Sequence, residues 1–266
     1  HRTLGRLDAL ANSLATRGDV ESTVARAKIL DELGDDEGAL LAYEVAIRKR
    51  PRDRDLRVAL ARLHARLGRL DRVIDEYRRL VRESGGDPTF VRELALIYER
   101  MGRRRDAEAM LAELLRAFPR SAPLARVNAE LRERFGDRDA LRAALLHWKR
   151  VAPDDPEPRI ALGAELLAAG DRKRALDEFR GLLDVGGDPV EARLELARVL
   201  ADHDLLDEAE EAMRPIAARA PEHLEIARQL ASIYERPRAT ESTSLRAERN
   251  RQAEAHWRMV LSHPQA

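Results

Sequence analysis

A glycine recurs every 34 residues along most of this 266-residue chain. A fixed period of this size is typical of proteins built from stacked copies of one small structural unit. Other positions keep the same period: a small residue stands seven places before each glycine, a large apolar one nine places after it, and a proline or glycine seventeen places after it. The period therefore predicts a repeat protein, and its glycines are Gly34, Gly68, Gly102, Gly136 and Gly170.

The columns predict that each repeat is a helix A, a tight turn, a helix B and a second turn. A glycine suits the left-handed residue that ends helix A, because it has no Cβ to clash. Asp35, Asp137 and Asp171 follow their glycines, and we expect them to cap helix B. Two antiparallel helices approach closely only where side chains are small, and the small column holds Ala27, Ala61, Ala95, Ala129, Gly163, Ala197 and Ala231. The large column beside this crossing holds Tyr43, Tyr77, Leu111, Leu145, Phe179 and Met213.

Helix B carries Ala39 four residues before Tyr43, and Ala175 four residues before Phe179. With the period and the prolines, this pattern resembles the tetratricopeptide repeat, although Arg57 and other residues stand where that family's motif has tryptophan. The resemblance implies an all-α fold, a right-handed superhelical array of about seven helix–turn–helix repeats over residues 20–266. Residues 1–19 form a leading helix or a truncated repeat.

Three places depart from the regular pattern. Asn128 and Arg132 stand where other repeats have apolar or aromatic residues, and we expect looser packing there. The last repeat has an insertion of about ten residues within 236–250, which we expect to be an exposed loop. The chain begins at His1 rather than Met, and no polar cap covers its last helix pair, so we expect a fragment of a larger protein or an end that associates with itself or a partner.

The chain lacks cysteine, which excludes disulfides, cysteine-bound zinc and thiol catalysis. Its seven histidines form no paired metal-binding spacing. His203 lies between Asp202 and Asp204; we expect a packed or surface histidine, with a metal site as the alternative. We therefore expect no catalytic residue, no cofactor and no enzyme activity.

The chain has 48 basic and 48 acidic residues, so its net charge is zero. A nucleic-acid surface normally shows a marked basic excess, which makes a nucleic-acid partner unexpected. No apolar run is long enough to span a bilayer. The predominance of arginine over lysine indicates a genome rich in G and C, and we expect a bacterial, cytoplasmic protein, with the periplasm as the alternative because the N-terminus looks truncated.

The resemblance implies that the helix A faces line a concave groove where ligands bind. Basic residues 34 apart on these helices form rows, which predict a strip for an acidic peptide or a C-terminal carboxylate. Because Glu93, Glu99, Glu130 and Glu133 lie nearby, the alternative is a solvated face of Arg–Glu pairs. The predicted binding residues are Lys28, Arg62, Arg66, Arg92, Arg100, Arg126 and Arg134.

These observations favour a non-catalytic protein–protein interaction scaffold that binds a peptide or protein. Two alternatives remain open. One is a helical-repeat RNA-binding module, against which stand the zero net charge and the lack of aromatic stacking platforms. The other is an accessory domain of a truncated enzyme.

Overall fold

The computed structural model describes residues 2–185, 188–238 and 241–262. Over these residues every regular element is helical, with fifteen α-helices and one short 3-10 helix, and the all-α prediction is confirmed. The chain forms two compact units, His1–Leu131 (unit 1) and Arg132–Ala266 (unit 2). The boundary between them falls inside the helix that carries Asn128 and Arg132.

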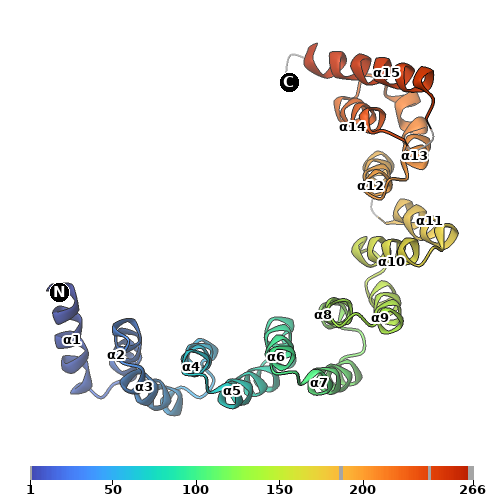
Figure 1. Cartoon of the computed structure of the whole chain (residues 1–266). Coiled ribbons are helices and arrows are strands. Elements are labelled where there is room, and N and C mark those ends of the chain that lie inside the picture. The colour runs from blue at the N-terminus through green and yellow to red at the C-terminus, as the bar shows by residue number, and fades with distance from the viewer. Residues whose placement is uncertain (1, 186–187, 239–240, 263–266) are drawn as a thin grey trace. The chain divides into compact units, whose positions relative to one another are not determined.

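The helices alternate as the period predicts, and Figure 1 shows α2, α4 and α6 of unit 1 along one side of the stack and α3, α5 and α7 along the other. A first helix, α1, spans Arg2–Ala15. The A helices are α2 (Val20–Leu33), α4 (Arg54–Arg66), α6 (Pro88–Arg100), α8 (Ala122–Arg134), α10 (Glu157–Ala168), α12 (Pro189–Asp202) and α14 (Leu224–Glu235). The B helices are α3 (Asp36–Lys49), α5 (Leu70–Glu83), α7 (Arg104–Ala117), α9 (Arg138–Val151), α11 (Arg172–Arg180, extended by the 3-10 helix Gly181–Asp184), α13 (Leu206–Arg219) and α15 (Thr243–Ser262).

The turn between helices A and B is built as the sequence predicts. Gly34 adopts the left-handed conformation, with φ at +77°, and ends α2 there. The side chain of Asp35 then accepts a hydrogen bond of 3.0 Å from the backbone N–H of Gly38. Asp137 and Asp171 cap α9 and α11 in the same way. These caps fix where each B helix begins, because they satisfy N–H groups that have no partner within the helix.

The core of each unit lies where helix A crosses helix B. The residues of the small column on A and of the large column on B are all buried, as the two columns predict. In repeat five, Gly163 on α10 lies directly against the ring of Phe179 on α11. The repeat fold therefore depends on this pairing of a small and a large side chain.

The insertion in the last repeat differs from the predicted exposed loop. Residues 239 and 240 lie outside the described part of the chain, but α15 already begins at Thr243, so residues 243–250 are helical rather than looped. Ser242 caps the helix through a hydrogen bond of 3.3 Å from the N–H of Leu245, and good helix formers follow. Arg238 and Arg249 are mostly buried and pair with Asp207. The insertion is therefore packed against α13 by ion pairs that no repeat pattern encodes.

Candidate binding surfaces

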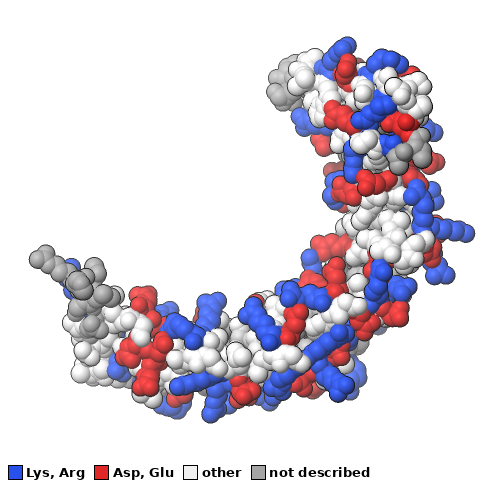
Figure 2. Space-filling view, viewed as in Figure 1, with Lys and Arg blue, Asp and Glu red and all other residues white. Residues whose placement is uncertain are grey.

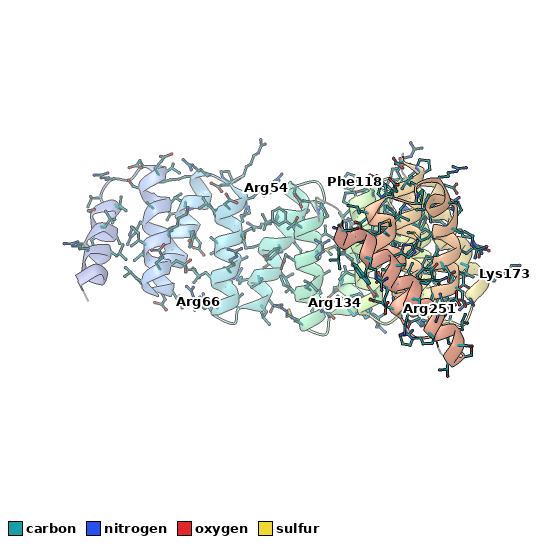
Figure 3. The ribbon with its side chains drawn as sticks, turned by 90° about the horizontal axis from the view of Figure 1, so that it is seen from above. Arg54, Arg66, Phe118, Arg134, Lys173 and Arg251 are labelled. Carbon is teal, nitrogen blue, oxygen red and sulfur yellow. The ribbon has the colours of Figure 1, made fainter. Side chains whose placement is uncertain are left out.

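The predicted basic residues lie on A helices, and Arg66 is the last residue of α4. Figure 3 labels Arg54 and Arg66 at opposite ends of this helix, which places Arg66 at the rim of the stack rather than at the middle of the A helices. Its guanidinium lies 2.6 Å from a carboxylate oxygen of Asp31 and also contacts Asp36. These hydrogen bonds raise the pKa of Arg66 above its ordinary value. Arg66 therefore links two neighbouring repeats, and its charge is already compensated.

Arg92 and Arg126 share one carboxylate. Arg92 on α6 makes two hydrogen bonds of 2.8 and 3.2 Å to Glu130, and Arg126 donates to the same side chain at 3.2 Å. All three residues lie in unit 1. For this pair, and for Arg66, the structure matches the alternative of a charged face held in ion pairs.

Lys28, Arg62 and Arg100 are exposed and make no ion pair with any residue that the structure describes. They lie on α2, α4 and α6, all in unit 1, and Arg100 is the last residue of α6, so it occupies the same rim position as Arg66 on α4. Arg134 is exposed at the last residue of α8 and belongs to unit 2. The predicted strip is thus reduced to three basic residues on unit 1 whose charge has no carboxylate partner among the described residues.

Three clefts of the described residues lie on the other side of the hairpins, between consecutive B helices. One of about 680 Å³ lies between α5 and α7 with α6 as its floor. One of about 370 Å³ lies between α3 and α5 over α4, and in unit 2 one of about 410 Å³ lies between α11 and α13 over α12. They are the same cleft in three repeats, because the floor position is Tyr98, His64 and Leu200 at whole multiples of the period. Sequence reasoning missed them, since it followed only the rows on helix A.

The cleft between α5 and α7 has an apolar floor and charged walls. Tyr98 is 2% exposed and accepts a hydrogen bond of 2.7 Å from Nε of Arg78, whose guanidinium lies 5.7 Å from the centre of the ring. Arg79 and Arg82 continue the α5 wall, and Glu113 stands on the α7 wall. Figure 2 shows blue side chains along the margin of unit 1 that carries the B helices. The arrangement suits an apolar group with negative charge on the α5 side.

His64 is the floor residue of the cleft between α3 and α5. The side chain is 6% exposed, and its Nδ1 makes no hydrogen bond within the described residues. Burial lowers the pKa of His64, an effect that nearby Arg69 and Arg72 reinforce and Glu76 opposes. The folded state therefore favours the neutral imidazole of His64 over the protonated one.

We expect the protein to lose stability as the pH falls through the ordinary histidine pKa of about 6.5, because unfolded His64 then binds a proton that folded His64 takes up only at lower pH. His64→Leu, which installs the residue that Leu166 and Leu200 supply in other repeats, should raise the melting temperature and reduce this loss. Thermal melts at about pH 7.5 and about pH 5.5 test this. His256, whose pKa burial also lowers, leaves a residual dependence. An equal pH dependence in both proteins would contradict the assignment to His64.

No group of three His, Cys, Asp or Glu side chains in the described residues is arranged to hold a metal ion. His203 instead stacks on Phe179, with ring centres 5.2 Å apart, so it is a packed histidine as expected. Over the same residues, no helix is both long and apolar enough to cross a membrane.

Comparison with known proteins agrees with the repeat pattern. Two family profiles, both described as tetratricopeptide repeat, match residues 24–88 with 160–223, and residues 93–121, which together are more than half of the chain. No curated protein sequence matches.

Solved structures with a similar chain path include three repeat proteins. MamA from Desulfovibrio magneticus RS-1 is 14% identical, with a TM-score of 0.42 over 62% of this chain and 94% of its own. TTC0263, a thermophilic TPR protein from Thermus thermophilus, is 25% identical, with a TM-score of 0.39 over 69% of this chain and 100% of its own. YrrB, described as a TPR protein with an unusual peptide-binding site, is 13% identical, with a TM-score of 0.40 over 70% and 96%.

Proposed function

Because the chain belongs to the tetratricopeptide repeat family, we propose that it is a non-catalytic scaffold that binds a peptide or protein partner. The observation that carries the proposal is the series of open clefts, which have charged rims and a buried leucine in each floor and are found at the same position in three repeats. Such surfaces hold a guest by a few buried apolar anchors, while charge selects the partner. A reaction centre needs converging catalytic groups instead.

We place one partner site on the A-helix face of unit 1, by which we mean the exposed surface of α2, α4 and α6. Lys28, Arg62 and Arg100 support this site, since each is exposed and each keeps its charge uncompensated by the described residues. Acidic groups of the partner are the chemistry that these side chains recognise. Arg66 and Arg92 serve instead to join neighbouring repeats through Asp31, Asp36 and Glu130, and Arg126 pairs with the same Glu130 within α8.

We expect Arg62→Glu with Arg100→Glu to weaken partner binding about tenfold, because each change turns attraction to an acidic group into repulsion. Peptides selected from a displayed random library on the immobilised chain would serve as ligands, and calorimetry would measure their affinity. The control is Arg105→Glu with Lys173→Glu, which makes the same change in net charge at exposed residues that line none of the described clefts. Failure to select any peptide, or tighter binding of single-stranded RNA than of peptides, would overturn the proposal.

A further inference from the structure

We propose that unit 1 carries a second docking surface on its B-helix face, centred on α5, for an acidic amphipathic segment of a partner protein. This surface comprises the cleft between α5 and α7 and the neighbouring cleft between α3 and α5, both of which Arg79 lines. It is separate from the A-helix face, since α5 is a B helix and α4 and α6 lie beneath it.

The first observation is a group of arginines on α5 that have no carboxylate partner among the described residues. Four arginines of this helix are exposed and form no ion pair with a residue that the structure describes; they are Arg72, Arg78, Arg79 and Arg82. The helix also carries four carboxylates, but Glu76 and Glu83 are bound by Arg57 of α4 and form no ion pair with these four arginines. Asp71 lies 3.8 Å from Arg103 of the next repeat, and Asp75 can balance at most one of the four. The four arginines can therefore bind acidic groups of a partner, although the chain as a whole has no net charge.

The fold does not require these arginines. The cleft between α11 and α13 in unit 2 has the same construction, and Leu200 occupies its floor where Tyr98 lies in unit 1. At the positions of Arg79 and Arg82, however, unit 2 has Gly181 and Asp184. A cleft can thus form in this array without arginines at these two positions, although Arg180 keeps the position of Arg78. The fold does not explain Arg79 and Arg82, which are free to contact a ligand.

The second observation is the apolar floor between the charged walls. Leu94 and Tyr98 of α6 are almost fully buried beneath it, and Met110 and Leu114 of α7 border it. A volume of about 680 Å³ admits several side chains. Burial of apolar side chains here gains about 25 cal/mol per Å² removed from water, so the guest must present apolar residues as well as acidic ones.

Protein fits this surface better than nucleic acid does. The α7 wall carries Asp106 and Glu113, which would repel a phosphate chain lying along the cleft. The aromatic residue of the site, Tyr98, is at the floor with its ring covered by Arg78 and Arg103, so it offers no face for a base to stack on. An amphipathic segment can place its acidic side against α5 and its apolar side in the cleft, away from the acidic residues of α7.

The test is a titration of the whole chain with a fluorescent peptide that carries leucines on one helical face and glutamates on the other. We expect saturable binding that weakens tenfold or more in Arg79→Glu with Arg82→Glu, and by less than twofold in the control Arg105→Glu with Lys173→Glu. Ala109→Trp, which adds bulk at an exposed position lining the same cleft, should weaken binding without any change of charge. Thermal melts establish that each variant is folded.

Further titrations separate this surface from the A-helix site and from RNA binding. Replacing the leucines of the peptide by alanine, or its glutamates by lysine, should abolish most of the binding. Arg62→Glu with Arg100→Glu should leave it unchanged, so failure of the A-helix site and failure of this one are distinguishable. Three results would overturn the proposal. The first is that the leucine–glutamate peptide binds Arg79→Glu with Arg82→Glu as tightly as the unchanged chain. The others are that the unchanged chain binds the lysine peptide as tightly as the glutamate peptide, or poly(U) RNA more tightly than the glutamate peptide.

Discussion

Arg57→Met is expected to lower the free energy of unfolding by about 2–3 kcal/mol, because it leaves a mostly buried carboxylate without its partner. Arg57 is 4% exposed, and its guanidinium lies 3.2 Å from Glu76 and 3.2 Å from Glu83. It also donates a hydrogen bond of 2.8 Å to the backbone carbonyl of Pro51. Methionine keeps the packing of the stem but leaves Glu76, whose side chain is 13% exposed, as a nearly buried charge without a partner.

The size of this loss depends on how exposed to water each carboxylate is once Arg57 is gone. Glu83 is 38% exposed and regains water, which is why the expectation lies below the roughly 3–5 kcal/mol typical of a fully buried pair. Urea denaturation of the single variant and of Arg57→Met with Glu76→Gln measures the difference. The second change removes the stranded charge and should restore at least half of the loss. A single-variant effect below about 0.5 kcal/mol would mean that the pairing is only a surface interaction.

Gly163→Ala is expected to destabilise the chain by about 1–3 kcal/mol through overpacking, although alanine favours a helix over glycine by about 1 kcal/mol. A Cβ at this position would lie 2.3 Å from Cε1 of Phe179 and 2.7 Å from its Cδ1. The ring is fully buried, so a shift away from the new methyl group would have to displace other core side chains. Urea denaturation again provides the measurement, and a gain in stability would show that the ring yields easily.

A double variant separates this clash from other causes. Gly163→Ala with Phe179→Leu recreates the pairs found in repeats three and four, Ala95 with Leu111 and Ala129 with Leu145. We expect it to be more stable than Gly163→Ala alone, because the smaller leucine leaves space for the new methyl group. Additive effects of the two changes would contradict a direct contact.

The periodic features of the fold were predictable because each depends on residues close in sequence. A glycine that ends a helix and an aspartate that caps the next act within a few positions, so Gly34 and Asp35 mark their turn without tertiary information. Asp204 shows the limit of the rule, since it keeps the left-handed turn at φ +58° without being glycine.

Charge pairing was not predictable in the same way. Whether an arginine is compensated depends on its rotamer and on carboxylates of neighbouring helices, as for Arg66 with Asp31 of the preceding repeat. The same holds for Arg57, which binds two of the four acidic residues of α5. Rows of like residues on helix A therefore predicted where charged residues lie, but not which of them lack an ion-pair partner. The unpaired arginines of α5 were found only in the structure.

Uncompensated arginines beside an apolar cleft mark the docking surface that we propose for this scaffold. Hydrogen exchange of the whole chain tests this surface directly, when measured with and without a saturating amount of the leucine–glutamate peptide. A side chain seated there should slow the opening of the helices that it contacts. Slower exchange in the backbone amides of α5 and α7, absent in the Arg79 and Arg82 variant, is the predicted result. Unchanged exchange in α5 and α7, with slowing confined to α2 and α4, would contradict it.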